Sequence, residues 1–490
     1  MTTTTLNRIE QLRKIALPLE PDAEQRLQWR EQVIQYTDAF LKSLPELPAV
    51  RATHDKGVGI LDSPISEAPI PIEQALDLLK NHVDRPGENE GTTPGYLAFI
   101  PSGGLYASAL GDYIAAVTNR YVGLSYCSPG AARIEPMLLR WMADFVGYPE
   151  TAAGDFTSGG SLANLTAIVT ARNAHQLKAA DFPRAVAYLT DQTHHSVVKG
   201  LRIAGMEECV VRHVPLDEHY RMRTEALEAA IRSDRQAGLI PWLVAAAAGS
   251  TDTGAVDPLA SIADIANHYQ LWMHGDGAYG AMFALCERGK AILRGIERAD
   301  SVTMDPHKGL FMTMGTGAVL VRNGDNLLKA FQSHANYLEG AETASSTGEV
   351  SQADLSPELT RPFRGLRLWL ALKLTGVAPF RAALEEKLLL ARHFYEGLQR
   401  LDGFVTGPIP DLSVVTFRYR PSHGNANEFN RKLIQAIQQD GRIFLSSTQI
   451  NGEVSLRLTV LGFRTHLETV ELALEILQQK AKEIESGVNF

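Results

Sequence analysis

The sequence predicts an α/β fold with a mostly parallel central sheet, an N-terminal helical segment and a small C-terminal α+β domain. From about residue 96 onward, short apolar runs alternate with longer stretches of helical periodicity. Apolar runs such as "AVAYL" and "WLVAAAA" are continuous, which is typical of parallel strands that are buried on both faces. Polar residues follow several of these runs, and ligands bind at the carboxyl ends of the strands in such sheets.

Composition and charge narrow the class of protein. The chain has 490 residues, 45% hydrophobic and 21% charged, as expected of a globular protein with more than one domain. Its net charge of −9 argues against nucleic acid or an anionic membrane as a partner. The three cysteines, Cys127, Cys209 and Cys286, lack metal or disulfide spacing, so we expect no metal and a cytoplasmic location. The N-terminus has no signal-peptide pattern, and no apolar run could span a bilayer.

Three regions are expected along the chain. Residues 1–95 form a helical segment, with helical periodicity in "DAEQRLQWREQVIQYTDAFLKSL" and in "IEQALDLLKNHV" on either side of a proline-rich connector. Residues 96–375 form the large α/β domain. Residues 376–490 form the small domain, with strands in "SVVTFRYR" and "EVSLRLTV" and a final helix. One long helix over "RGLRLWLALKLTGVAPFRAALEEKLLLARHFYEGLQRL" joins these two domains in this prediction.

Polar residues that could bind a ligand or take part in a reaction follow three of the predicted strands. The turn "SGGSLAN" opens a helix, whose free N–H groups can cradle a phosphate, although such a turn also serves as an ordinary helix start. In "HGDGAYG", Asp276 ends a strand and can either hold a protonated ring nitrogen or cap the loop. In "DQTHHS", an imidazole could stack on a flat ring or move protons, and at most one of His194 and His195 is expected to face a site.

Lys308 ends the predicted strand in "SVTMDPHKG". At the end of a buried strand its amine is partly desolvated, and a neutral amine can form a Schiff base. A solvated surface lysine is the alternative for this residue taken alone. Together the four features supply a phosphate cradle, a ring-stacking group, a partner for a pyridinium nitrogen and a reactive amine. Pyridoxal 5′-phosphate requires these parts.

From about Tyr96 to at least Leu374, these motifs resemble the group II pyridoxal-phosphate-dependent amino-acid decarboxylases, the family of aromatic-L-amino-acid, glutamate and bacterial tyrosine decarboxylases. The resemblance implies the fold-type I architecture of aspartate aminotransferase-like enzymes. It implies a homodimer with active sites at the interface and N-terminal helices that wrap the partner. It also implies an amino acid as the small-molecule substrate.

The resemblance assigns a role to each motif. Lys308 is the Schiff-base lysine, Asp276 is the partner of the pyridinium nitrogen, and His194 stacks on the ring, so these three form the expected catalytic set. The remaining expected cofactor contacts, two at the ring and three at the phosphate, are Thr251, Ala278, Gly160, Ser161 and His307.

The substrate pocket is less sharply indicated. The segment "YLAFIPSGG" resembles the family's pocket segment, which implies Phe99, Ile100 and Ser102, and Leu124 adds to a partly apolar pocket for an aromatic or other bulky side chain. Core packing explains the apolar members equally well. Other candidates are Arg120 and Tyr126 for an acidic group, and Arg364 and Arg457 for a carboxylate.

Two features depart from the family pattern. Family members that act on aromatic amino acids carry a loop tyrosine that protonates the α-carbon, and a gap-free comparison places Gln352 at this position. His194, Tyr337 or a residue of the partner subunit are alternative proton donors. Gly275 and Gly277 replace larger residues beside Asp276, which is expected to leave more room near the ring.

The expected reaction is decarboxylation of an L-amino acid to the amine and CO₂. Without the loop tyrosine, an oxygen-dependent decarboxylation–deamination to an aldehyde is the alternative, because a longer-lived carbanion can react with oxygen. A lyase or aminotransferase on the same scaffold, and a binding protein without activity, also remain open. A hydrolase triad of Ser161, Asp276 and His307 is the reading from another enzyme class, although Ala163 replaces a glycine of the usual nucleophile turn.

Overall fold

The computed structural model describes residues 3–51, 56–87, 93–333 and 350–487. The chain divides into two compact units, Met1–Asn89 and Glu90–Phe490. The division after Asn89 lies a few residues before the expected boundary at residue 95. The expected boundary at residue 375 lies inside the second unit and stays a prediction.

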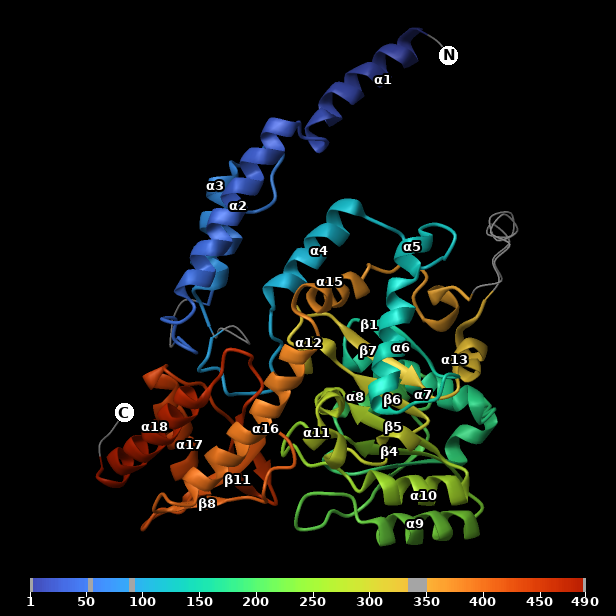
Figure 1. Cartoon of the computed structure of the whole chain (residues 1–490), viewed down its shortest axis with the longest axis vertical. Coiled ribbons are helices and arrows are strands. Elements are labelled where there is room, and N and C mark those ends of the chain that lie inside the picture. Colours follow the sequence, from blue (N-terminus) through green and yellow to red (C-terminus); the bar gives the residue numbers. More distant parts are fainter. Residues whose placement is uncertain (1–2, 52–55, 88–92, 334–349, 488–490) are drawn as a thin grey trace. The chain divides into compact units, whose positions relative to one another are not determined.

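The first unit is helical (blue in Figure 1). Its α-helices are α1 (Thr3–Ala16), α2 (Ala23–Ser43) and α3 (Ile72–Leu79). The Asp22 side chain caps α2 by accepting a hydrogen bond of 2.8 Å from the Gln25 N–H. None of the described residues in these three helices is buried. Apolar side chains such as Leu6, Leu12 and Trp29 are exposed, so this unit offers an uncovered apolar surface.

A seven-stranded sheet organises the second unit in the order β1-β7-β6-β5-β4-β2-β3. Strands β2 to β6 pair in parallel, and β7 runs antiparallel to both β1 and β6, so the sheet is mostly parallel as predicted. The strands are β1 (Ala153–Thr157), β2 (Ala185–Leu189), β3 (Val210–His213), β4 (Ile240–Ala247), β5 (Trp272–Gly277), β6 (Ser301–Met304) and β7 (Gly317–Val321).

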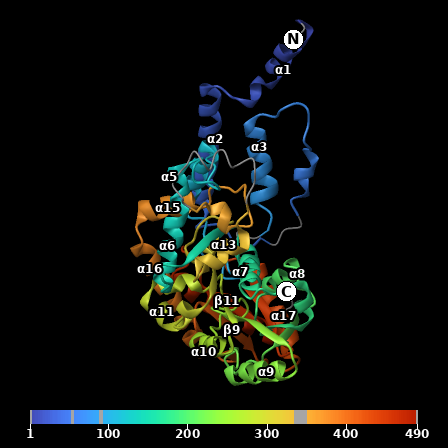
Figure 2. The same cartoon turned by 90° about the vertical axis from the view of Figure 1, so that its right-hand side faces the viewer.

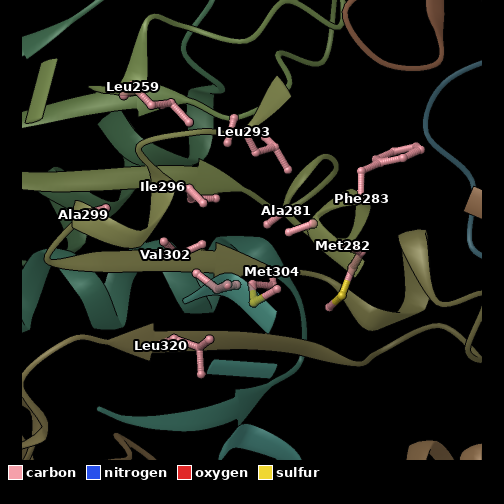
Figure 3. Close-up of a cluster of buried hydrophobic side chains, with 14 of the residues drawn as sticks. Leu259, Ala281, Met282, Phe283, Leu293, Ile296, Ala299, Val302, Met304 and Leu320 are labelled. Carbon is pink, nitrogen blue, oxygen red and sulfur yellow. The ribbon is translucent and has the colours of Figure 1, made fainter. Parts of the chain in front are cut away.

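Helices cover both faces of this sheet, which explains its continuous apolar strands. On β2, Val186 and Tyr188 join one hydrophobic cluster, whereas Ala187 and Leu189 join another on the opposite face. Figure 3 shows part of the first cluster, where Val302 and Met304 of β6 lie beside Leu320 of β7. Helices α9 and α10 lie side by side next to β4 in Figure 1, and Figure 2 shows the same two helices near each other from the side. The helices that pack on the sheet include α6 (Ile134–Val146), α7 (Gly160–Ala174), α8 (His195–Ile203), α9 (Thr224–Gln236), α10 (Leu259–Tyr269) and α13 (Gly324–Phe331).

The prediction of a single long helix before the C-terminal region is wrong. The structure has two helices there, α15 (Gly365–Thr375) and α16 (Ala378–Leu398). Gly376 ends α15 with a φ of 72°, a conformation that glycine adopts without strain. Pro379 stands in the first turn of α16, where its missing N–H costs no hydrogen bond. Helical periodicity continued across this junction and concealed it.

The C-terminal region has its own four-stranded antiparallel sheet, in the order β10-β11-β9-β8. Helix α16 lies between this region and the elements of the large sheet, and it contacts both (Figure 1). A separate hydrophobic cluster forms its core, as the predicted small α+β domain requires. Its elements are β8 (Phe404–Thr406), β9 (Val414–Tyr419), α17 (Ala426–Asp440), β10 (Ser446–Ile450), β11 (Glu453–Thr459) and α18 (Leu467–Glu485).

The remaining helices connect these parts. Among the described residues they include α4 (Tyr106–Thr118), α5 (Pro129–Ala132), α11 (Glu287–Ile292), α12 (Pro306–Gly309), and the 3₁₀ helices η5 (Ala281–Leu285) and η7 (Gln352–Leu355). Among the described helices, none combines the length and the apolar character needed to cross a membrane.

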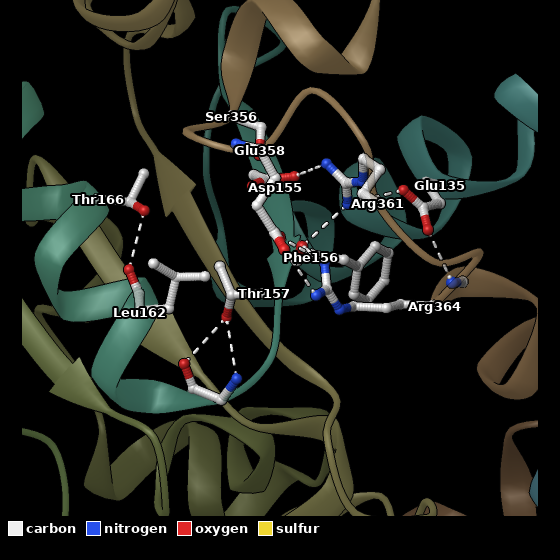
Figure 4. Close-up of polar contacts among 12 residues, drawn as sticks. Glu135, Asp155, Phe156, Thr157, Leu162, Thr166, Ser356, Glu358, Arg361 and Arg364 are labelled. Carbon is white, nitrogen blue, oxygen red and sulfur yellow. Dashed lines mark hydrogen bonds and ion pairs between the residues drawn. The ribbon is translucent and has the colours of Figure 1, made fainter. Parts of the chain in front are cut away.

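A buried ion cluster fastens the segment before α15 to the large sheet (Figure 4). Arg361 pairs with Asp155 of β1 and with Glu135 of α6, the latter at 2.9 Å, and all three side chains are almost fully buried. Burial raises the pKa of Asp155 to about 6, although Arg361 opposes this shift. Arg364 pairs with Glu358, with 3.0 Å between Nη2 and Oε1, so its charge serves this cluster rather than a bound carboxylate.

Candidate active site

A cavity of about 380 Å³ opens at the carboxyl ends of β4, β5 and β6. Separate loops and helix starts reach it after β1, β2, β4, β5 and β6, because the carboxyl ends of parallel strands meet at one edge of a sheet. Its lining includes every residue predicted to bind the cofactor: Gly160, Ser161, His194, Thr251, Asp276, Ala278, His307 and Lys308. These residues span almost 150 positions of the sequence, from Gly160 to Lys308, and the fold brings them together.

Lys308 stands on α12, which begins directly after β6 and the linking residue Asp305. Its Nζ lies 2.9 Å from Oδ2 of Asp305, whose side chain is 1% exposed. The sequence reasoning missed Asp305, although a carboxylate three residues before the lysine signals such a pair in a short helix. The amine is therefore held in place by a buried counter-ion at the cavity wall.

Asp276 is on β5 and is held through both carboxylate oxygens. Oδ2 accepts a hydrogen bond of 3.1 Å from Asn164 Nδ2, and Oδ1 accepts one of 3.3 Å from the Ala278 N–H. Gly277 faces the other side of the strand, where a Cβ would approach the Cβ of Ala281 to 2.5 Å. The expectation that Gly277 leaves more room near a ring is therefore wrong, because this glycine permits close packing against η5.

His194 forms the N-cap of α8. Its Nδ1 accepts a hydrogen bond of 3.3 Å from the Ser196 N–H and lies 2.7 Å from Ser196 Oγ. Burial lowers the pKa of His194, and the charge of Asp276 opposes this shift. Among the two adjacent histidines, His194 lines the cavity and His195 is exposed, which matches the expectation that at most one faces a site.

The glycine turn at the start of α7 lines the cavity next to Ala278. A Cβ on Gly160 would lie 3.1 Å from both the Cβ of Ala278 and Oδ2 of Asp305, so a larger residue would crowd the cavity. Behind the turn, His307 Nδ1 donates a hydrogen bond of 2.7 Å to the Thr316 carbonyl, and burial lowers the pKa of His307. Its nearest carboxylate is Asp305, with a closest distance of 3.9 Å, so the hydrolase triad with Asp276 is not formed.

Arg457 reaches the cavity region from β11, but it does not present a free guanidinium. Nη2 donates to the Thr251 carbonyl at 2.6 Å, Nε to the Asp252 carbonyl at 3.2 Å, and Nη1 to Ser446 Oγ at 2.8 Å. The suggestion that Arg457 binds a substrate carboxylate is therefore not supported. The residue instead fixes the loop that carries Thr251.

The four predicted substrate residues do not line this cavity within the described part of the chain. They are Phe99, Ile100, Ser102 and Leu124. Phe99 is 48% exposed and meets the Phe444 ring edge-on, whereas Leu124 is buried. Gly103, which follows Ser102 in the chain, does border the site, because its N–H donates a hydrogen bond of 3.2 Å to the His307 carbonyl. The substrate assignment of these four residues stays a prediction.

Gln352, the residue at the expected loop-tyrosine position, is buried on η7. Its Nε2 donates to the Gly154 carbonyl of β1 at 3.4 Å, and it does not line the cavity. It is therefore not placed to protonate a substrate there. The other loop candidate, Tyr337, lies outside the described residues.

With this geometry in place, comparison with known proteins identifies the family. A family model described as "Pyridoxal-dependent decarboxylase conserved domain" matches residues 59–420. The chain belongs to the pyridoxal-dependent decarboxylase family. Pyridoxal phosphate is therefore its cofactor. The family, the enzyme class and the cofactor predicted from the sequence are confirmed.

Individual relatives of this decarboxylase support the same family assignment. The chain is 38% identical over 402 residues to an aromatic-L-amino-acid decarboxylase of Bacillus atrophaeus, covering 81% of this chain and 82% of the relative. It is 28% identical over 483 residues to a phenylacetaldehyde synthase of Arabidopsis thaliana, covering 96% and 98%. The crystal structure of Oryza sativa TDC with PLP and tryptamine superposes with a TM-score of 0.87 at 27% identity, covering 95% and 99%. The fold-type I expectation and the decarboxylase activity are thereby confirmed.

The residues present in the decarboxylase cavity fit pyridoxal phosphate. Oδ1 of Asp305 is buried without a hydrogen-bond partner among the described residues, beside the amine of Lys308. Gly160 lines the cavity and has no side chain, so a ligand can approach the backbone closely at the start of α7. An amine, a held carboxylate and a helix start around one cavity match the aldehyde, ring nitrogen and phosphate of this cofactor.

His274 predicts how the stability of this decarboxylase depends on pH. It lies on β5, and burial lowers its pKa to about 4, although Asp276 opposes this shift. The unfolded chain, with an ordinary pKa of 6.5, binds a proton between these values that the folded chain does not bind. Stability is therefore expected to fall as pH decreases through this window, by up to about 1.4 kcal/mol per pH unit from this group.

Urea unfolding of the wild type and of His274→Gln at a series of acidic pH values tests this expectation. The variant should show a flatter decline of the unfolding free energy below neutral pH. A residual slope is expected in both proteins, because burial also lowers the pKa values of His194 and His307. An equally steep decline in the variant would contradict the assignment to His274.

Proposed function

We propose that this chain converts an aromatic L-amino acid into the corresponding amine and CO₂. The observation that supports it most is the convergence of Lys308, Asp276 and His194 on one cavity at the strand ends. The aromatic preference is supported by relatives named for aromatic amino acids, including a tryptophan decarboxylase of Oryza sativa at 30% identity over 91% of this chain.

Each cavity residue has a proposed task. Lys308 would hold the cofactor covalently through its amine, and Asp305 would keep the lysine oriented. Asp276 would hold the ring nitrogen in its protonated form, and His194 would stack on the ring. The start of α7, with Gly160 and Ser161, receives the phosphate. The further contacts proposed are His307 near the phosphate, and Thr251 and Ala278 near the ring.

When bound, the cofactor supplies a protonated ring that accepts the electron pair left by the departing carboxylate. The protein contributes orientation, because the bond that breaks is the one held perpendicular to the ring plane. It also returns a proton to the α-carbon. Among the described cavity residues, His194 is the proposed donor, because Ser196 occupies its Nδ1 and Nε2 then carries the ring proton.

A second function, oxygen-dependent release of an aldehyde, has specific support. Residues 338–361 contain no tyrosine or phenylalanine, and Gln352 is buried against β1. Two phenylacetaldehyde synthases, from Arabidopsis thaliana and Petunia hybrida, are among the relatives. In this reaction O₂ accepts two electrons and water supplies the aldehyde oxygen, so the amino acid, O₂ and one water give the aldehyde, ammonia, CO₂ and hydrogen peroxide.

We also propose that the enzyme is a cytoplasmic homodimer with its active sites at the interface. The exposed apolar side chains of α1 and α2 support association, because a second copy would cover them. The cysteines Cys127, Cys209 and Cys286 are free, which suits a reducing compartment. Sedimentation of the purified chain would show whether it dimerises.

Mass spectrometry of the products distinguishes the two reactions. The cofactor-loaded protein is incubated in air with aromatic, acidic and basic amino acids. We expect an amine and CO₂ from an aromatic substrate. An aldehyde together with ammonia and peroxide would replace the decarboxylase proposal with the oxidative one, and turnover confined to acidic substrates would overturn the aromatic preference.

A further inference from the structure

Behind the cavity, buried polar side chains form a continuous hydrogen-bonded network that the sequence motifs did not reveal. We call it the donor network. Five of its six members are at most 2% exposed, and the sixth, Trp272, is 5% exposed. The members come from α7, α8, β5 and β6: Asn164, Ser196, Trp272, His274, Ser301 and Thr303. A buried network with satisfied polar groups holds its members in one arrangement.

The side-chain amide of Asn164 is the branch point. Its Oδ1 accepts hydrogen bonds of 2.6 Å from Thr303 Oγ1 and of 3.0 Å from His274 Nε2. Its Nδ2 donates 2.9 Å to Ser196 Oγ and 3.1 Å to Asp276 Oδ2. An amide offers two acceptor sites and two donors, so all four are used. A flipped amide would turn its oxygen toward the Asp276 carboxylate, which fixes the orientation.

Proton positions along one arm follow from this orientation. The indole N–H of Trp272 can only donate, and it does so to Ser301 Oγ at 2.8 Å. Ser301 Oγ lies 2.8 Å from His274 Nδ1, so its hydroxyl proton is free to donate there. His274 Nε2 then carries the ring proton and donates it to Asn164. Every hydrogen bond in this arm points toward Asp276.

The other arm leads to His194. Ser196 Oγ accepts from Asn164 and lies 2.7 Å from His194 Nδ1, and the Ser196 N–H donates to the same nitrogen. Because Nδ1 receives these donors, the proton of the neutral His194 ring is on Nε2. Asn164 is thus connected to Asp276 and, through Ser196, to His194, two of the residues that are proposed to meet the cofactor ring.

We propose that Asn164 is a positioning residue that orients the Asp276 carboxylate toward the cofactor ring nitrogen and holds His194 as the Nε2–H tautomer. This inference rests on the proposed function of the cavity. Asn164 acts through its neighbours, since Thr303 and His274 hold its oxygen and thereby aim its N–H groups.

The variant Asn164→Leu matches the side-chain volume approximately and removes all four hydrogen bonds. Losing a hydrogen bond to a charged group is expected to weaken cofactor binding by about 10- to 100-fold. The pH at which the absorption of the bound cofactor changes should also shift, in the same direction as in Asp276→Asn. The dissociation constant and the absorption spectrum are measured across a pH series.

Thr166→Val is the matched control. Thr166 is a buried residue on the same helix, and its hydroxyl donates 2.8 Å to the Leu162 carbonyl one turn earlier. We expect it to bind cofactor as the wild type does and to keep the wild-type spectral transition. A wild-type transition in Asn164→Leu, or an equal shift in Thr166→Val, would overturn the proposal.

The tautomers of the histidines can be measured in the wild type. This measurement tests the proposed role of Asn164 even if Asn164→Leu does not fold. In ¹⁵N NMR spectra of the histidine-labelled, cofactor-free protein, His274 and His194 should both appear as neutral Nε2–H tautomers. An Nδ1–H tautomer at either residue contradicts the direction of the network. If the wild type fails to bind pyridoxal phosphate, the proposed function is wrong, whereas the tautomer result still tests the network by itself.

Discussion

Replacing Lys308 with alanine is expected to lower kcat by roughly 10³-fold or more, because the covalent link to the cofactor is lost. Lys308 is 2.9 Å from Asp305 and lines the cavity, so no other described lysine shares its position. Activity is measured with the substrate identified by product analysis. Reduction with borohydride and peptide mass spectrometry should show the cofactor attached to the peptide that contains Lys308.

Lys199→Ala is a suitable control, because Lys199 is an exposed lysine on α8, the helix that begins next to His194. Its activity and cofactor attachment should equal those of the wild type. Cofactor attached to a different lysine in the wild type, or near-normal turnover by Lys308→Ala, would contradict the assignment. A fold defect is recognised separately from the unfolding temperature of the cofactor-free protein. Lys308→Ala is expected to lower this temperature, because it leaves the buried Asp305 carboxylate without its counter-ion, so activity is compared at a temperature where both proteins are folded.

Replacing Arg361 with methionine is expected to destabilise the protein by about 3–5 kcal/mol, because it leaves buried carboxylates without a counter-ion. Arg361 pairs with Asp155 and Glu135 and also donates 2.9 Å to the Phe156 carbonyl (Figure 4). The pKa of Asp155 is already raised to about 6 in the presence of Arg361, so without the guanidinium this carboxyl takes up a proton more readily. Urea unfolding of the cofactor-free protein measures the effect.

Two further variants test the cause of this loss. Arg392→Ala breaks the exposed pair between Arg392 and Glu396 on α16, and we expect little change in stability. Adding Asp155→Asn and Glu135→Gln to Arg361→Met removes the unpaired charges and should recover part of the lost stability. If Arg361→Met is as stable as Arg392→Ala, the buried cluster does not anchor the segment before α15.

The order of short strands and polar residues along the chain was enough to predict the main parts of the site. Asp276 and Lys308 each follow a short apolar strand, and "SGGSLAN" opens a helix after another. Parallel strands bring their carboxyl ends to one edge of a sheet whatever the details of packing, so these residues were expected to meet. The break between α15 and α16 was missed, because helical periodicity continues through Gly376 and Pro379.

The sequence by itself therefore determined the fold class, the family and the residues expected around the cofactor. Only the tertiary structure revealed Asn164 as the branch point beside Asp276 and the carbonyl contacts that occupy Arg457. The physical reason is the separation along the chain of the residues that determine each feature. A strand end is recognised from neighbouring residues, whereas a hydrogen-bond partner depends on register and packing between segments that can lie 206 residues apart, as Arg457 and Thr251 do.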